Sequence, residues 1–180
     1  MADAESDPEI EQRRERFSRQ RERLAAKYLK PAAERPPSIA RGVHHVALIC
    51  GDVEETIRFY QEVVGFPLLD LFENRDYAGS THFFHDLGHG NTLAFFDFPG
   101  HSHPEFAETL GGLQHCAISV TPEHFAAARG RLEAAGVHLH GPDEGIEGSI
   151  YFRDPNGAQI ELTTDPLMEM MDLPLASSGP

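Results

Sequence analysis

The sequence predicts an α+β fold in which two tandem βαβββ modules follow an N-terminal helical arm. One observation is a repeated order of elements, in which a strand-like run and a helix precede three further strand-like runs. A second observation is the spacing, because His45 and His115, and likewise Gly65 and Gly136, recur at an interval of about 70 residues. Repetition at one interval constrains a fold more strongly than local propensity does, so the repeat decides the fold prediction.

Residues 1–41 differ in composition from the rest of the chain and predict a helical arm with a Pro-rich linker. The segment EQRRERFSRQRERLAAKYLK is rich in helix-forming residues, and Phe17, Leu24 and Tyr28 share one stripe of a helix. The prolines that follow end that helix. Two outcomes stay open: the arm packs on the domain or on a second subunit, or it stays solvated and partly frayed.

The first module spans residues 42–100 and opens with the strand-like run GVHHVALIC. A helix over DVEETIRFYQEVVGF follows, with Asp52 as its N-cap and Gly65 at its end. Three short strand-like runs complete the βαβββ order: PLLDLFE, THFFHDL and NTLAFFDF.

The second module spans residues 111–165 and repeats this order from the run GLQHCAISV onward. Its helix has a Thr cap, proline at the first helical position and Gly136 at its end. Three strand-like runs again follow: VHLHG, GSIYF and AQIELTT. We therefore expect one domain over residues 42–165 and a tail over residues 166–180.

Alternation along the strands assigns the histidines to faces, because successive side chains of a strand point to opposite sides. His45 lies on the less apolar face of its strand, whereas His44 points the other way. His115 and Glu161 take the matching, less apolar face in the second module. If the repeats form one curved mixed sheet, His45, His115 and Glu161 converge in its concavity.

Two imidazoles and one carboxylate suit a divalent first-row metal and leave positions open for water, substrate or dioxygen. A lone strand histidine or a surface glutamate is ordinarily structural. Three ligand types at matched positions of a repeat favour a metal site, so we expect His45, His115 and Glu161 to be the ligands. His44 is expected to be a structural neighbour, because Gln114 occupies the matching position of the second module.

The charge of the chain narrows the classes of partner. Fifteen Lys and Arg residues against 29 Asp and Glu residues give a formal net charge of −14. Nucleic acid and anionic membranes are therefore not expected partners. No apolar stretch approaches the ~18 residues of a membrane span, and the charged N-terminus is unlike a signal sequence. We expect a soluble cytoplasmic protein in which Cys50 and Cys116 are buried thiols.

Residues 42–165 resemble the vicinal oxygen chelate superfamily, which contains glyoxalase I, fosfomycin and bleomycin resistance proteins, methylmalonyl-CoA epimerase and type I extradiol dioxygenases. The resemblance is carried by three segments, of which the last is the most specific: HHVAL, GLQHCAIS and YFRDPNGAQIEL. It implies a curved mixed sheet around a divalent metal, with His45, His115 and Glu161 as the ligands.

The fourth ligand position separates the branches of that superfamily. The residue equivalent to Glu161 in the first module is Ala94, where glyoxalase I and the epimerases have Glu or Gln. A three-ligand site is similar to those of extradiol dioxygenases and fosfomycin thiol transferases. This acidic chain shows no clear cation-rich loop for a phosphonate, so the resemblance to the dioxygenases is preferred.

The resemblance to dioxygenases also implies catalytic residues. Tyr151 matches the tyrosine that hydrogen-bonds a bound diol, but Asn91 occupies the position of the histidine that handles protons. The histidines that could replace it are His82, His85 and His89 from the neighbouring hairpin and His140 from the other side. We expect one of His85, His89 and His140 to act as the acid or base, because an imidazole titrates near working pH.

Three functions stay open. The first is an Fe(II) extradiol-type ring-cleavage dioxygenase that chelates two adjacent oxygens of a small substrate. The second is a glyoxalase-like isomerase, an epimerase or a thiol transferase with Mn, Zn, Ni or Co. The third is a metal-free protein that binds a small molecule such as an antibiotic. Related proteins often dimerise, and the arm offers a surface for a homodimer.

Overall fold

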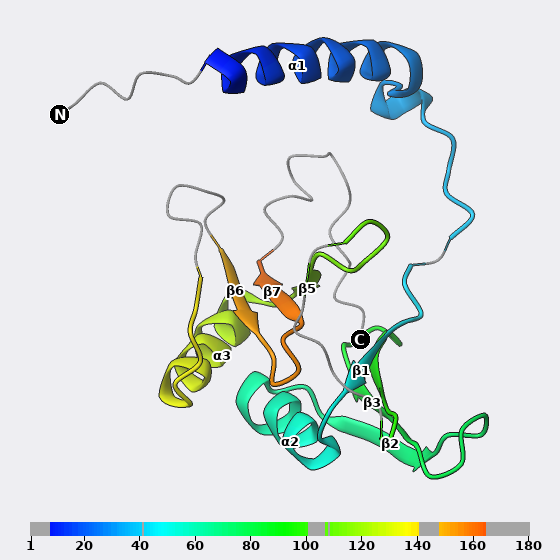
Figure 1. The fold of residues 1–180 in the computed structure, drawn as a ribbon, viewed down its shortest axis with the longest axis vertical. Coiled ribbons are helices and arrows are strands. Elements are labelled where there is room, and N and C mark those ends of the chain that lie inside the picture. The colour runs from blue at the N-terminus through cyan, green and yellow to red at the C-terminus, as the bar shows by residue number, and fades with distance from the viewer. Residues whose placement is uncertain (1–7, 41, 101–106, 108, 141–147, 165–180) are drawn as a thin grey trace, which may run out of the picture. The chain divides into compact units, whose positions relative to one another are not determined.

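The computed structural model describes residues 8–40, 42–100, 107, 109–140 and 148–164 of the chain (Figure 1). The tail expected over residues 166–180 lies outside the described residues. The chain divides into two compact units, Met1–Arg41 and Gly42–Pro180.

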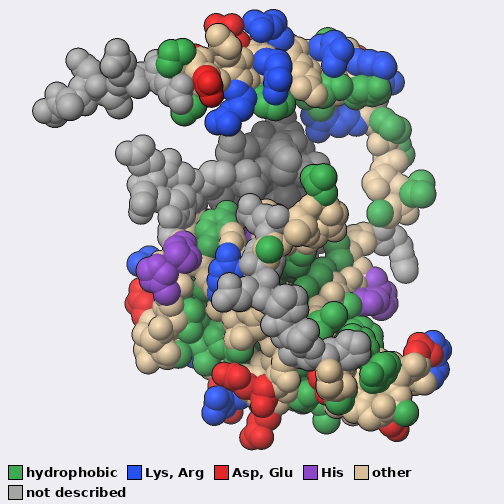
Figure 2. All heavy atoms as spheres, in the orientation of Figure 1, with side chains coloured by type: hydrophobic (Ala, Val, Ile, Leu, Met, Phe, Trp, Pro, Cys, Tyr) green, Lys and Arg blue, Asp and Glu red, His purple; other side chains and the backbone are tan. Residues whose placement is uncertain are grey.

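The first unit contains the predicted helix, α1 (Pro8–Tyr28), and a short 3-10 helix, η1 (Ala32–Glu34). Basic side chains gather along α1 (Figure 2). None of its residues is buried, and the predicted apolar stripe of Phe17, Leu24 and Tyr28 is exposed. The predicted helix is therefore confirmed. Over the ranges that the structure describes, no helix has both the length and the apolar character to cross a membrane.

The first half of the second unit is a four-stranded mixed sheet with one helical segment. Its elements are β1 (His45–Cys50), α2 (Val53–Arg58), η2 (Phe59–Val64), β2 (Leu68–Glu73), β3 (Thr81–Asp86) and β4 (Thr92–Asp97). The strand order is β1-β4-β3-β2, with β1 parallel to β4 and the other pairs antiparallel. This first sheet has the predicted βαβββ order.

The second half repeats the plan with a three-stranded sheet. Its elements are β5 (Cys116–Ser119), α3 (Pro122–Ala134), β6 (Ser149–Arg153) and β7 (Gln159–Thr163), in the order β5-β7-β6. The run VHLHG, predicted to be a strand, contributes one bridge, in which His140 and Tyr151 exchange two backbone hydrogen bonds of 2.8 Å. The α+β class is confirmed, and the strands form two mixed sheets where one curved sheet was expected.

Both predicted helix caps are present. The Asp52 carboxylate accepts a hydrogen bond from the Glu55 N–H at 2.7 Å, and the Thr121 hydroxyl accepts one from the His124 N–H at 3.2 Å. The first helix departs from the prediction in its second half, because η2 is a π-helix. Gly65, in the left-handed conformation, closes it by donating its N–H to the Tyr60 carbonyl.

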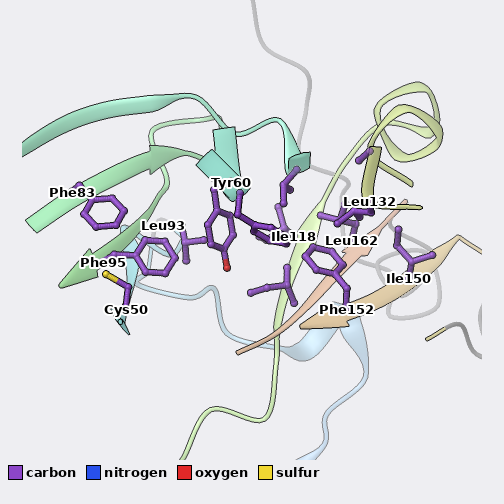
Figure 3. Close-up of a cluster of buried hydrophobic side chains, with 14 residues drawn as sticks. Cys50, Tyr60, Phe83, Leu93, Phe95, Ile118, Leu132, Ile150, Phe152 and Leu162 are labelled. Atoms are coloured by element: carbon purple, nitrogen blue, oxygen red, sulfur yellow. The ribbon is translucent and has the colours of Figure 1, made fainter. Parts of the chain in front are cut away.

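One apolar core serves both sheets. In Figure 3 the Tyr60 side chain lies between Phe95 of the first sheet and Phe152 of the second, and all three are fully buried. The Tyr60 hydroxyl donates to the Asp154 carboxylate at 3.0 Å, which ties η2 to the turn between β6 and β7. Each sheet therefore has a core face that meets this cluster and an open face on its far side.

Gly65→Ala is expected to lower the free energy of unfolding by about 1–3 kcal/mol. Its φ is +101°, and a Cβ would lie 2.6 Å from Nη2 of Arg131, whose guanidinium donates to the Val63 and Val64 carbonyls. The matched control is Gly130→Ala in α3, where a Cβ has open space and stability is expected to rise by about 0.5–1 kcal/mol. Urea unfolding of both variants measures the difference, and a loss at Gly130 equal to that at Gly65 would contradict it.

Candidate metal centre

The open face of the second sheet holds a buried carboxylate against an imidazole. Glu161 lies in β7 opposite Ala117 of β5, and His115, two residues before Ala117, shares that face. The Glu161 side chain is 3% exposed, and its Oε2 lies 3.1 Å from Nε2 of His115. A carboxylate this buried needs a cation or donors around it, and an imidazole nitrogen already points at it.

Tyr151 completes this cluster from β6. It pairs with Glu161 across the β6–β7 ladder, and its ring lies 5.7 Å from the His115 ring in an edge-to-face arrangement. Burial, the hydrogen bond to Glu161 and the charge of Glu161 all raise the pKa of Tyr151 above its ordinary value. The phenol therefore stays protonated at neutral pH and serves as a donor toward the carboxylate.

His45 stands on the open face of the first sheet. It is the exposed first residue of β1, and its ring lies 6.4 Å from the Phe84 ring of β3. Its Nδ1 lies 2.8 Å from Nδ1 of His44, so one nitrogen of the pair donates and the other accepts. The contact with His44 occupies Nδ1 of His45, so Nε2 is the nitrogen of His45 that is left to bind a metal. A hydrogen bond at the second ring nitrogen is typical of a metal-binding histidine.

The register of the strands shows how far the repeat extends into the site. Ala94 lies opposite Ala47 of β1 and Phe84 of β3, as Glu161 lies opposite Ala117 of β5 and Tyr151 of β6. The first sheet therefore repeats the histidine and the aromatic ring but replaces the carboxylate by a methyl group. Ala94 cannot bind a metal, so the first sheet offers one ligand and the second offers two.

The structure brings His115, Glu161 and Tyr151 together and leaves His45 apart from them. His45 belongs to β1 of the first sheet, whereas Glu161 belongs to β7 of the second. Among the described residues of one copy, no group of three or more His, Cys, Asp or Glu side chains could hold a metal ion. The donor set still suits a divalent metal, because two imidazoles and a buried carboxylate are hard-to-borderline ligands.

Two of the expected acid–base histidines lie at the surface. His89 sits at the turn between β3 and β4, exposed and with a φ of +51°. His140 lies beside Tyr151 on the second sheet, and its ring is 4.3 Å from the His138 ring. The bridge puts His140 on the same face as Tyr151 and Glu161. Of the three histidines expected to act as acid or base, His140 is therefore the one that pairs directly with this cluster.

His85, the third of them, lies in the core. It is fully buried, its Nδ1 donates to the Phe66 carbonyl at 2.8 Å, and its Nε2 has no hydrogen-bond partner. Alternation in β3 puts it on the face opposite Phe84, so it cannot reach a substrate on the open face. His82 lies on the open face instead. Strand alternation was the signal that separates the two histidines. His82 and Phe84 are two residues apart and point the same way, whereas His85 directly follows Phe84 and points to the other face.

Acidification is expected to destabilise the protein through His85. Burial lowers the pKa of His85 below its ordinary value of 6.5, although the hydrogen bond to Phe66 opposes this. Above that value both the folded and unfolded states hold neutral imidazole. As the pH falls below it, the unfolded chain gains a proton that the folded chain refuses, and stability is lost until the folded pKa is passed.

His85→Leu is therefore expected to lower the free energy of unfolding by about 1 kcal/mol at about pH 8, because the hydrogen bond to Phe66 is lost. It should also flatten the decline in the free energy of unfolding between that pH and about pH 5.5. Urea unfolding at both pH values measures this. The control is His124→Leu, at an exposed position of α3, which should keep the slope of the unsubstituted protein. An unchanged slope in the His85 variant would refute the role given to His85.

Known proteins share this fold and parts of this sequence. Residues 42–162 match the family described as the Glyoxalase/Bleomycin resistance protein/Dioxygenase superfamily. A Bacillus subtilis protein named "Putative ring-cleaving dioxygenase MhqE" is 28% identical over 127 residues, which cover 69% of this chain and 41% of that protein. The chain thus spans less than half the length of MhqE. A "Probable lactoylglutathione lyase" of Vibrio parahaemolyticus is 32% identical over 124 residues, 66% of this chain and 86% of that protein.

A solved structure agrees with these sequence relationships. The glyoxylase/bleomycin resistance protein/dioxygenase domain from Frankia sp. EAN1pec superposes with a TM-score of 0.60 at 25% identity. The alignment covers 69% of this chain and 97% of that domain. The likeness therefore extends over nearly the whole of the other domain.

Proposed function

The chain belongs to the glyoxalase/bleomycin resistance protein/dioxygenase superfamily, and from this we propose that it is an Fe(II) enzyme of the extradiol ring-cleavage type. Members of the superfamily are mostly metal-dependent enzymes that act on small molecules. The proposed substrate carries two adjacent oxygens, and the proposed site of action is the cytoplasm. The observation that supports a dioxygenase most is Ala94, because it leaves three ligands and so leaves metal positions free for substrate and dioxygen.

The proposed ligands are His45 from the first sheet and His115 and Glu161 from the second. Because the described residues of one copy do not bring these three side chains together, the site is proposed to form between two copies. The open face of the first sheet of one copy then covers the open face of the second sheet of its partner. A twofold dimer of this kind contains two equivalent sites, each with ligands from both copies.

The metal, when bound, supplies Lewis acidity that favours the anionic form of a diol. The residues of the chain do the rest. His44 orients His45 through the contact between their Nδ1 atoms, and Tyr151 donates toward the Glu161 side of the site. His140 shares the face of Tyr151 and is the proposed proton carrier on that side.

The test is oxygen uptake by protein that has been loaded anaerobically with Fe(II) and mixed with a panel of catechol-type diols. Uptake in step with loss of the aromatic absorbance is the expected result, and it should vanish in His45→Ala and His115→Ala. The control is His124→Ala, outside the proposed site on α3. The absence of oxygen uptake with every diol of the panel would contradict the dioxygenase proposal.

A second candidate is a glyoxalase-like reaction with a redox-inactive metal. The observation in its favour is the 32% identity to the lactoylglutathione lyase of Vibrio parahaemolyticus named above. Metal analysis of protein purified without chelators separates the two candidates. Iron supports the dioxygenase, whereas Mn, Zn, Ni or Co together with isomerase or lyase activity supports the alternative.

A further inference from the structure

The open face of the first sheet carries an aromatic surface next to His45. Four side chains form it, and we call them the aromatic shelf: Phe72 of β2, His82 and Phe84 of β3, and Phe96 of β4. Their registers place them on one face, because Phe72 pairs with His82 and His82 pairs with Phe96. Phe84 follows His82 by two residues and so points the same way.

The shelf is one connected stack of rings. The His82 ring stacks on Phe96 with centroids 3.7 Å apart and planes 6° apart, and it lies 4.3 Å from the Phe84 ring. Phe72 lies 5.4 Å from His82 and 5.8 Å from Phe84. These side chains are not in the core, since Phe72 is 46% exposed and the other three are half-buried.

The shelf reaches the proposed metal ligand through Phe84. The Phe84 ring is 6.4 Å from the His45 ring on one side and 4.3 Å from the His82 ring on the other. A molecule held at His45 therefore has one aromatic ring between itself and His82. Flat aromatic groups gain by offset stacking on such a ring, by about 0.5–1.5 kcal/mol beyond the area that they bury.

His82 is fixed as a hydrogen-bond acceptor. Its Nδ1 donates to the Phe95 carbonyl at 2.8 Å, because a carbonyl can only accept. In the neutral imidazole the other nitrogen, Nε2, then carries the lone pair. The hydrogen bond at Nδ1, the stacked Phe96 and the neighbouring Phe84 restrain the ring and so restrain the direction of Nε2.

We propose that the aromatic shelf is the substrate-specificity site of the enzyme, and that it selects ring diols with a donor group remote from the chelating oxygens. The substrate ring packs on Phe84, and a hydroxyl or amino group at its far end donates to Nε2 of His82. The proposal rests on the proposed function, because it takes His45 as the residue at which the chelating oxygens are held.

The test measures binding without turnover. Zn(II)-loaded protein is titrated anaerobically by calorimetry with catechol, which lacks a remote donor, and with 4-(hydroxymethyl)catechol, which has one. The second ligand is expected to bind about 3- to 10-fold more tightly, which corresponds to one net hydrogen bond. His82→Phe, which keeps the ring and removes Nε2, should abolish this preference and leave catechol affinity within about twofold.

Two further variants keep the result decisive. His82→Gln restores an acceptor and should recover part of the preference, whereas His124→Phe on α3 should leave it intact. Equal binding of both diols to the unsubstituted protein, or an unchanged preference in His82→Phe, would overturn the specificity site and leave the proposed function standing. Failure of both diols to bind the loaded protein would overturn the two proposals together.

Discussion

Glu161→Ala is expected to lower the affinity for divalent metal by more than about a hundredfold. The carboxylate is the buried donor of the proposed site, and the same change removes the partner of His115 and Tyr151. Titration with Mn(II), followed by the loss of its free-ion EPR signal, measures the affinity. Glu161→Gln keeps the size of the side chain, and its metal affinity should lie between that of the unsubstituted protein and that of Glu161→Ala.

The matched control is Glu123→Ala, an exposed carboxylate in the first turn of α3. It should bind metal as the unsubstituted protein does. Circular dichroism and urea unfolding check that the Glu161 variants are folded. A folded Glu161→Ala protein that binds Mn(II) with unchanged affinity would remove Glu161 from the ligand set.

Asp154→Ala is expected to lower the free energy of unfolding by about 3 kcal/mol. The carboxylate is 5% exposed and accepts hydrogen bonds from the Tyr60 hydroxyl, the Asn156 backbone and side chain and the Ala158 N–H. Without it, the fully buried Tyr60 hydroxyl loses its partner in the core that joins the two sheets. Urea unfolding at neutral pH measures the loss.

Asp154→Asn keeps one acceptor oxygen and should lose less than the alanine variant. The control is Asp76→Ala, at an exposed carboxylate that pairs only with its neighbour Arg75 in the described contacts, and its unfolding curve should match that of the unsubstituted protein. The burial of Asp154 also raises the pKa of its carboxyl, so acid should protonate it early in the folded state. Equal stability of Asp154→Ala and Asp76→Ala would contradict the role of this network.

Much of the fold could be predicted from the sequence because both modules have the same order of strand-like runs and helix. The caps at Asp52 and Thr121 and the glycines that close the helices set the element ends, and all of them are observed. Strand alternation also assigns faces correctly wherever one face is clearly apolar. In β1 that contrast is strong, with Val46, Leu48 and Cys50 packed on the core.

The rest could not be predicted from alternation alone. In β3 both faces carry phenylalanine and histidine, so composition does not tell the core face of His85 from the open face of His82. Only the pairing with β4 decides it. The division into two sheets likewise depends on how Tyr60 and Asp154 join the modules, a contact between residues far apart in the sequence. The described residues of one copy do not bring the three expected ligands together, which is why the site is proposed to form between two copies.

Mixing two defective variants tests the central claim most directly. His45→Ala and Glu161→Ala are each expected to bind almost no metal alone. The two variants are unfolded together and refolded so that mixed dimers form. In each mixed dimer, one of the two sites regains all three ligands. At random pairing about a quarter of all sites should then bind Mn(II) again. No recovery in folded mixed dimers would contradict a site that His45 of one copy builds with His115 and Glu161 of another.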